Sequence, residues 1–201
     1  MTSPVTARDR AKAERSDAIL HAAARLFAAR GYSGVSLEDI GAAVGVSGPA
    51  VYRHFAGKQA LLGAVLVKVS EDLVSGGRRV AAAADDPGER MRALIEFHVE
   101  FALGNAEVIQ VQDRDVAFLS ETDRAEVRRL QRTYIDLWMD TLAPLHPMPE
   151  GPDQDELRLR VQACFGLINS TPHSTRTAVR RRAATAAVLT AMADAALRAT
   201  I

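Results

Sequence analysis

The sequence predicts an all-α protein: a small N-terminal helix-turn-helix domain joined by a long helix to a larger helical domain, with about nine helices in total. Apolar residues recur at helical spacing through most of the chain. We find no convincing β-strand pattern. A glycine turn at residue 45 separates two very short amphipathic segments, an arrangement typical of a helix-turn-helix.

The first short helix is expected to begin after Ser36. Ser36 is a good N-cap residue, and Asp39 occupies the acidic position of a capping box. Leu37, Ile40 and Val44 then follow at helical spacing and predict one buried face.

The second short helix is expected to begin after Ser47, its predicted cap, with Pro49 in its first turn. Gly45 suits the turn before it, because glycine adopts positive φ without strain. Val51 and Phe55 are expected to face inward. The positions left outward are Gly48, Pro49, Ala50, Tyr52, Arg53 and His54.

Residues 16–66 resemble the DNA-binding half of the TetR family of bacterial transcription regulators. The matching residues are Phe27, Gly31, Tyr32, Ser36, Ile40, Gly45, Val46, Ser47, Tyr52, Arg53, His54, Phe55, Lys58, Leu61 and Leu62. The resemblance implies a double-stranded DNA operator as partner, contacted by Ser36, Ser47, Gly48, Pro49, Ala50, Tyr52, Arg53, His54 and Lys58. Two positions depart from the family pattern: Ser36, where threonine is more common, and Gly41, which weakens a helix.

The composition is that of an ordinary soluble globular protein, with 48% hydrophobic and 25% charged residues and no net charge. Residues 1–65 hold eight Lys/Arg against five Asp/Glu, so the front of the chain is slightly basic. The N-terminus does not resemble a signal peptide, and the longest apolar run, residues 183–193, is too short to span a bilayer. We therefore expect a cytoplasmic protein without membrane contact.

The remaining helices are expected at about 8–30, 58–84, 91–104, 106–118, 121–142, 154–170 and 177–199, with residues 1–7 disordered. Gly76 and Gly77 are expected to bend or interrupt the long helix. Four of the eight prolines lie in a loop at 142–155. These ranges predict a DNA-binding domain at 8–66, with the helix-turn-helix at about 36–55, and an effector-binding and dimerisation domain at 67–201.

The last two helices are apolar on more than one face, and the chain has nothing left to cover them. We therefore expect a homodimer through these helices. Such a dimer would present two recognition helices about 34 Å apart to a palindromic site.

In the resembled family the rear domain holds the pocket for a small-molecule effector. The candidate lining residues are Phe97, Phe101, Gln110, Asp113, Phe118, Tyr134, Trp138, Phe165, Asn169 and Arg176, with His98 and Met139 as further possibilities. An aromatic stripe at helical spacing is also what an ordinary core contains, so both interpretations stay open.

Residues 113–142 resemble the matching region of TetR-family regulators of fatty-acid and acyl-CoA metabolism. Arg176 and its neighbours at 180–182 lie near the start of the last helix, where positive charges are unfavourable because of the helix dipole. An anion, such as a coenzyme A phosphate or an acidic side chain, would offset these charges. A regulator of drug efflux that responds to hydrophobic drugs is the alternative.

An enzyme is not expected, and neither is a cofactor or metal. Cys164 with His173, or a serine with a histidine, could be read as a nucleophile pair, but Cys164 lies among apolar residues typical of an inert core thiol. His98 with Glu96 and Glu100 is too sparse for a metal site.

An architectural DNA-binding protein would carry more positive charge. A repressor is favoured over an activator, because a bound dimer blocks a promoter by occupying it.

Overall fold

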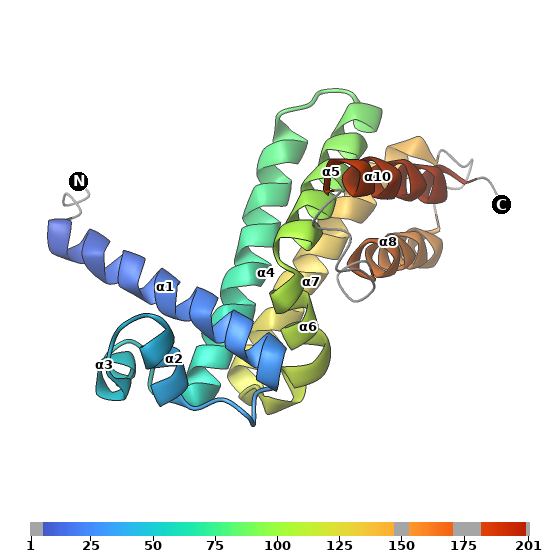
Figure 1. The fold of residues 1–201 in the computed structure, drawn as a ribbon. Helices are drawn as coiled ribbons and strands as arrows, with labels where there is room; N and C mark the ends of the chain where they lie inside the picture. The colour runs from blue at the N-terminus through green and yellow to red at the C-terminus, as the bar shows by residue number, and fades with distance from the viewer. Residues whose placement is uncertain (1–5, 147–152, 171–181, 200–201) are drawn as a thin grey trace.

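The computed structural model describes residues 6–146, 153–170 and 182–199. Within these ranges the chain forms nine α-helices and two 3₁₀ helices and no strand, which confirms the predicted fold class (Figure 1). The helices are α1 (Ala7–Arg30), α2 (Leu37–Ala43), α3 (Gly48–Tyr52), α4 (Lys58–Ala82), α5 (Pro87–Gly104), α6 (Ala106–Asp115), η1 (Val116–Phe118), α7 (Glu121–Leu142), η2 (Ala143–Leu145), α8 (Gln154–Asn169) and α10 (Arg182–Arg198). None of these described helices has the length and apolarity needed to cross a membrane.

Some predictions lie outside the described residues. These are the disorder of residues 1–5, residues 147–152 of the proline-rich loop, and the start of the last helix at residue 177 together with Arg176. Thr6 and Ala7, also predicted to be disordered, instead cap and begin α1.

The long helix α4 connects the two ends of the molecule without interruption (Figure 1). The interruption predicted at Gly76 and Gly77 does not occur. A side chain at Gly76 would overlap the ring of Phe97, and a Cβ at Gly77 would lie 2.7 Å from the ring of Tyr134. The two glycines therefore let α5 and α7 approach α4 closely.

The first hydrophobic core lies under α1, α2, α3 and the start of α4, around Ile19, Phe27 and Leu62. It also takes buried residues from α6 and α7, such as Val111 and Val127. The later helices thus pack directly on the N-terminal ones. The domain boundary predicted at residues 66 and 67 falls inside α4 and remains a prediction.

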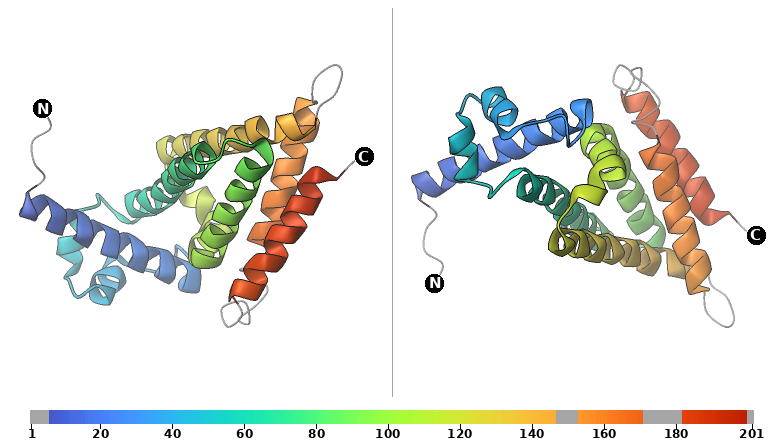
Figure 2. Two further views of the ribbon diagram at one scale, coloured as in Figure 1. Left: turned by 90° about the horizontal axis from the view of Figure 1, so that it is seen from above. Right: turned by 90° about the horizontal axis from the view of Figure 1, so that it is seen from below.

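The second core is built around Trp138, which is fully buried, and includes residues of α4, α5, α7, α8 and α10. Helices α8 and α10 lie side by side along one outer edge of the molecule (Figure 2). They bury Ile168 and Leu197 inward, yet Leu159, Val188 and Met192 are 66%, 58% and 50% exposed. These two helices therefore bury one face in the core and leave large apolar side chains on the surface.

Candidate nucleic-acid interface and ligand cavity

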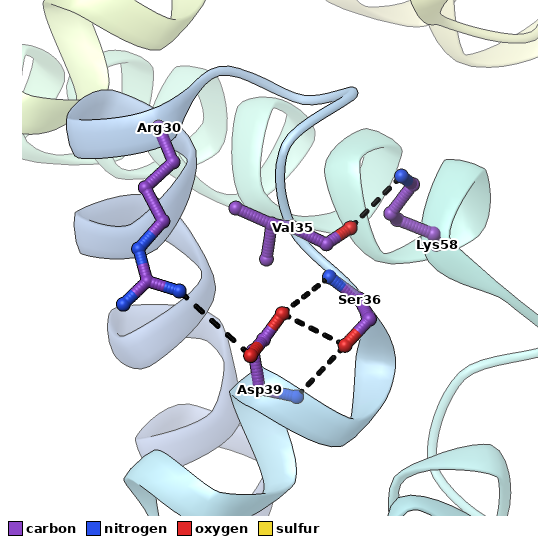
Figure 3. A network of polar contacts seen from close by, with 5 residues as sticks. All are labelled: Arg30, Val35, Ser36, Asp39 and Lys58. Atoms are coloured by element: carbon purple, nitrogen blue, oxygen red, sulfur yellow. Dashed lines mark hydrogen bonds and ion pairs between the residues drawn. The ribbon is translucent and has the colours of Figure 1, made fainter.

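The start of α2 is fixed by the predicted capping box (Figure 3). The Asp39 amide donates to Ser36 Oγ at 3.0 Å, while the Ser36 amide and hydroxyl donate to Asp39 Oδ2 at 2.9 and 2.8 Å. These bonds lower the pKa of Asp39, and Arg30 adds an ion pair at 3.7 Å. Because the Ser36 hydroxyl proton is used in the box, Ser36 has none to give a phosphate while the box is intact.

Lys58 is tied to the loop before α2. Its Nζ donates to the carbonyl oxygen of Val35 at 2.9 Å (Figure 3) and lies 4.5 Å from the centre of the Tyr32 ring. Its charge therefore contributes to holding the loop as well as to the surface potential.

The turn between α2 and α3 has the expected left-handed Gly45, with φ of 71°. A Cβ at Gly41 would lie 2.8 Å from the carbonyl oxygen of Val46, so Gly41 allows the turn to approach α2. The departure from the family pattern at this position thus has a packing reason. Gly48 is buried beneath the Glu38 side chain, which corrects its expected outward position.

Helix α3 has five residues and buries Val51 completely. The Ser47 side chain makes no capping hydrogen bond, so that part of the prediction is wrong and its exposed hydroxyl is available to other partners. Tyr52 is 56% exposed. Arg53 and His54 follow the helix in a turn, the arginine exposed and the histidine half-buried. Pro49 is exposed and Ala50 half-buried on the same short element.

An open hollow of about 470 Å³ lies between α3 and the loop before α2. It brings together Ser36, Tyr52 and Lys58, three of the predicted DNA contacts, and adds Ser33, which the sequence analysis missed. The Asp39 carboxylate also lines the hollow, so its groups able to donate to an anion are the hydroxyls of Ser33 and Tyr52 and the ammonium group of Lys58.

Arg114, at the end of α6, joins α6 to the C-terminal end of α1. Its guanidinium donates to the Phe27 carbonyl and, at 3.3 Å, to the Ala28 carbonyl near the C-terminus of α1. It also makes two bonds of 3.0 Å to the buried carboxylate of Asp115, which raises the pKa of Arg114. A cation at a helix C-terminus satisfies carbonyls that lack helical partners.

Five aromatic side chains form a cluster in the second core. His98 stacks on Phe165 at 4.6 Å between ring centres and on Tyr134 at 5.7 Å, and it meets Trp138 edge-on. Phe101 also stacks on His98, at 6.3 Å between ring centres. Four of the predicted effector residues are therefore brought together around His98.

A cavity of about 240 Å³ opens beside this cluster. Residues of five helices line it: Ser70, Leu73, His98, Gln112, Leu130, Gln131, Tyr134, Ile135, Phe165 and Asn169. Of the predicted effector residues Tyr134, Phe165 and Asn169 reach the wall, as does His98, named as a further possibility, whereas Phe101 and Trp138 pack behind it. Gln112 and Gln131 were missed, because helical spacing does not show which polar residue faces a hollow.

The cavity wall is uncharged at neutral pH. Burial lowers the pKa of His98 to about 4, with a small opposing effect of Asn169, so the imidazole is neutral. Burial also raises the pKa of Tyr134 well above its usual range.

The other predicted effector residues lie elsewhere. Phe97 packs against Gly76, and Phe118 is 42% exposed and stacks on Tyr32, between α1 and α2, at 4.7 Å. Gln110 is half-buried and Asp113 exposed, both away from the cavity wall. Met139 is buried in the second core.

Neither the groove between α5 and α10 nor the thiol of Cys164 favours a second binding or catalytic site. A wider groove of about 640 Å³ between α5 and α10 is lined mainly by alanines and carboxylates, and Glu100 and Asp194 are already paired with Arg182 and Arg198 at 2.8 Å. Cys164 is buried, and its surroundings raise the pKa of its thiol to about 12, so it carries no thiolate at neutral pH.

Two family profiles match the chain and together cover more than half of it. The profile described as bacterial regulatory proteins of the tetR family matches residues 19–65, and the tetracyclin repressor-like C-terminal domain matches residues 84–173. The chain belongs to the TetR family. It is a helix-turn-helix transcriptional regulator, and the family consists of DNA-binding regulators rather than enzymes.

Two relatives of this TetR-family protein differ in the sign of their regulation. The transcriptional activator FasR of Mycolicibacterium smegmatis is 38% identical over 88 residues, 44% of this chain and 40% of FasR. The transcriptional repressor KstR2 of Rhodococcus jostii is 27% identical over 143 residues, 71% of this chain and 70% of KstR2. The matched part therefore spans less than half of FasR.

Solved structures share the whole fold. The TetR-family regulator PfmR of Thermus thermophilus superposes with a TM-score of 0.76 at 25% identity, covering 98% of this chain and 99% of its own. AibR, solved with isovaleryl coenzyme A and operator DNA, superposes with a TM-score of 0.73 at 22% identity, covering 89% of this chain and 97% of its own. At that identity AibR shows the shared fold alone.

Proposed function

We propose that this TetR-family protein is a ligand-responsive repressor, a homodimer that binds a palindromic operator and leaves it when an apolar or amphipathic molecule fills the cavity. The observation that carries the proposal is the position of α6. This helix places Gln112 in the cavity wall and, two residues later, Arg114 on the end of α1. A ligand that displaces α6 would thereby displace the DNA-binding helices.

The DNA contacts are proposed at the exposed residues of α3 and the hollow beside it. Arg53 is the one predicted contact able to bind guanine bidentately. Tyr52, Ser47 and the hollow next to Lys58 would bind phosphates, and Ser36, Pro49, Ala50 and His54 would lie along the same surface. Gly48 would contribute through its backbone and the close approach it allows.

We expect Arg53→Ala to weaken operator binding by about tenfold or more, because a bidentate base contact contributes about 1–3 kcal/mol. Tyr52→Phe, which removes one hydroxyl, should cost about threefold to tenfold. Fluorescence anisotropy with a labelled operator measures both. Arg79→Ala, an exposed arginine at the far end of α4, is the matched control and should leave affinity unchanged.

These two variants should also keep their circular dichroism spectra and their dimer. If folding or dimerisation is lost together with DNA binding, the side chains are structural and the proposed interface is wrong. Lys58→Ala is a weaker test, because it also breaks the bond to Val35.

The dimer is proposed through α8 and α10, which lie along one outer edge of the molecule (Figure 2). Leu159, Val188 and Met192 are exposed apolar side chains of these two helices. A two-fold pairing there is isologous, so each copy covers the other with the same surface.

A fatty acyl-CoA is the first effector to test. AibR, which shares this fold, was solved with isovaleryl coenzyme A. A cavity of about 240 Å³ is smaller than pockets for drug-sized ligands, which span roughly 300–1,000 Å³. The proposal therefore favours a short or narrow apolar group inside the cavity over a bulky drug.

We expect a short-chain acyl-CoA to lower operator affinity at least tenfold in a mobility-shift titration, with free coenzyme A as the control. If hydrophobic drugs release the operator and thioesters never do, the acyl-CoA assignment is wrong and the drug-efflux alternative takes its place. If no small molecule changes binding, an architectural DNA-binding role is favoured.

A further inference from the structure

Two buried polar atoms of the cavity wall have no hydrogen-bond partner among the described residues. They are Nε2 of His98 and Oδ1 of Asn169. Asn169 is near enough to His98 to affect its pKa, but the two side chains do not meet with hydrogen-bond geometry. An unsatisfied buried polar atom costs about 1–3 kcal/mol. Both atoms are covered by their surroundings, so a group that entered between the two side chains would remove this cost by binding both.

The proton of His98 can be placed from its other nitrogen. Nδ1 lies 3.3 Å from the hydroxyl oxygen of Tyr134, and this is the one acceptor recorded for that buried hydroxyl. When the Tyr134 hydroxyl donates to Nδ1, the imidazole proton lies on Nε2, and the inference uses this tautomer. The cavity wall thus offers one donor, at His98, close to one acceptor, at Asn169.

The wall also restricts the charge of a ligand. None of the ten lining residues is an Asp, Glu, Lys or Arg. An ion inside would lose its hydration without gaining a counter-ion, which is far more costly than burying a neutral polar group.

We propose that the cavity binds the uncharged, apolar part of an effector that carries one hydroxyl group, held between His98 and Asn169. The hydroxyl oxygen accepts from His98 Nε2, and the hydroxyl proton goes to Asn169 Oδ1. Leu73, Leu130 and Ile135 enclose the carbon skeleton. The assignment rests on the proposed effector role of the cavity and names its ligand chemistry. If the effector is an acyl-CoA, its anionic coenzyme A part would lie outside the cavity.

The protein carries its own reporter for this test. Trp138 is the single tryptophan, is fully buried, and lies 4.9 Å from Phe165 and 5.7 Å from His98 between ring centres. Tryptophan fluorescence is followed at pH 7, without DNA, during titration with 1-hexanol, 1-methoxypentane, hexanoate and hexylammonium. The ether has the size of the alcohol but cannot donate a hydrogen bond. We expect 1-hexanol to bind at least tenfold more tightly than the other three.

Two variants test the named atoms. His98→Phe and Asn169→Leu should each weaken 1-hexanol binding about tenfold, and 1-hexanol should then bind no better than 1-methoxypentane. Retained binding of the ether shows that the cavity of a variant is still formed. His21→Phe replaces an exposed histidine of α1 and should change nothing.

Hexanoate or hexylammonium binding as tightly as 1-hexanol would overturn the inference. Equal binding of the alcohol and the ether would also overturn the inference, because it would mean that Asn169 pairs directly with His98. The absence of any binding would overturn it as well. The repressor proposal can fail on its own. If 1-hexanol binds as expected but no ligand releases the protein from its operator, the hydroxyl site stands and the regulatory role is wrong.

Discussion

Trp138→Ala is expected to lower the free energy of unfolding by about 3–5 kcal/mol, the usual cost of truncating a large buried aromatic side chain. Trp138 is fully buried and packs edge-on against Tyr134 and Phe165. Since domains are stable by only about 5–15 kcal/mol in total, the loss should be evident in urea denaturation followed by circular dichroism.

The void left by Trp138 would lie next to the existing cavity. Indole, the lost ring as a free molecule, should therefore bind the variant and raise its midpoint of thermal unfolding, while leaving the wild-type midpoint unchanged. Trp138→Phe, which keeps an aromatic ring, is the matched control and should lose much less stability. A Trp138→Ala protein as stable as the wild type would contradict the packing described for the second core.

His98 should make the protein less stable as pH falls from about 6.5 to about 4. Its pKa is about 4 in the folded protein, against about 6.5 in an unfolded chain. Between these values the unfolded chain binds a proton that the folded protein does not accept, so acidification favours unfolding. The total effect is about 3 kcal/mol, with no further change from His98 at pH values below its folded pKa.

The measurement is the free energy of unfolding of the wild type and of His98→Phe at several pH values between 7 and 4. Other groups titrate in this range, so the difference between the two proteins carries the result. The wild type should lose up to about 3 kcal/mol more than the variant over this interval. Parallel pH profiles would mean that His98 is open to solvent or has a buried acidic partner.

Features that depend on neighbours in the chain were predictable from the sequence. The Ser36 and Asp39 capping box and the positive φ of Gly45 are local, so residue type and spacing were enough. The uncapped Ser47 shows the limit of this reasoning, because a good cap residue does not always turn its hydroxyl toward the helix.

Features that depend on distant residues were not predictable. Gly76 and Gly77 look like helix breakers until Phe97 and Tyr134 are placed against them. Phe118 is of a residue type that often lines pockets, yet its ring stacks on that of Tyr32, which is distant in the sequence. Helical periodicity shows which face is buried but not what covers it.

The central claim is that α3 and the hollow beside it bind DNA in a two-fold dimer. It is tested most directly by selecting bound duplexes from a random-sequence pool with the purified protein and with Tyr52→Ala/Arg53→Ala. We predict that the wild type enriches a palindrome whose half-sites lie about one helical turn, or a multiple of it, apart, and that the variant enriches none. Enrichment of the same sequences by both proteins, or of no two-fold sequence by the wild type, would contradict the claim.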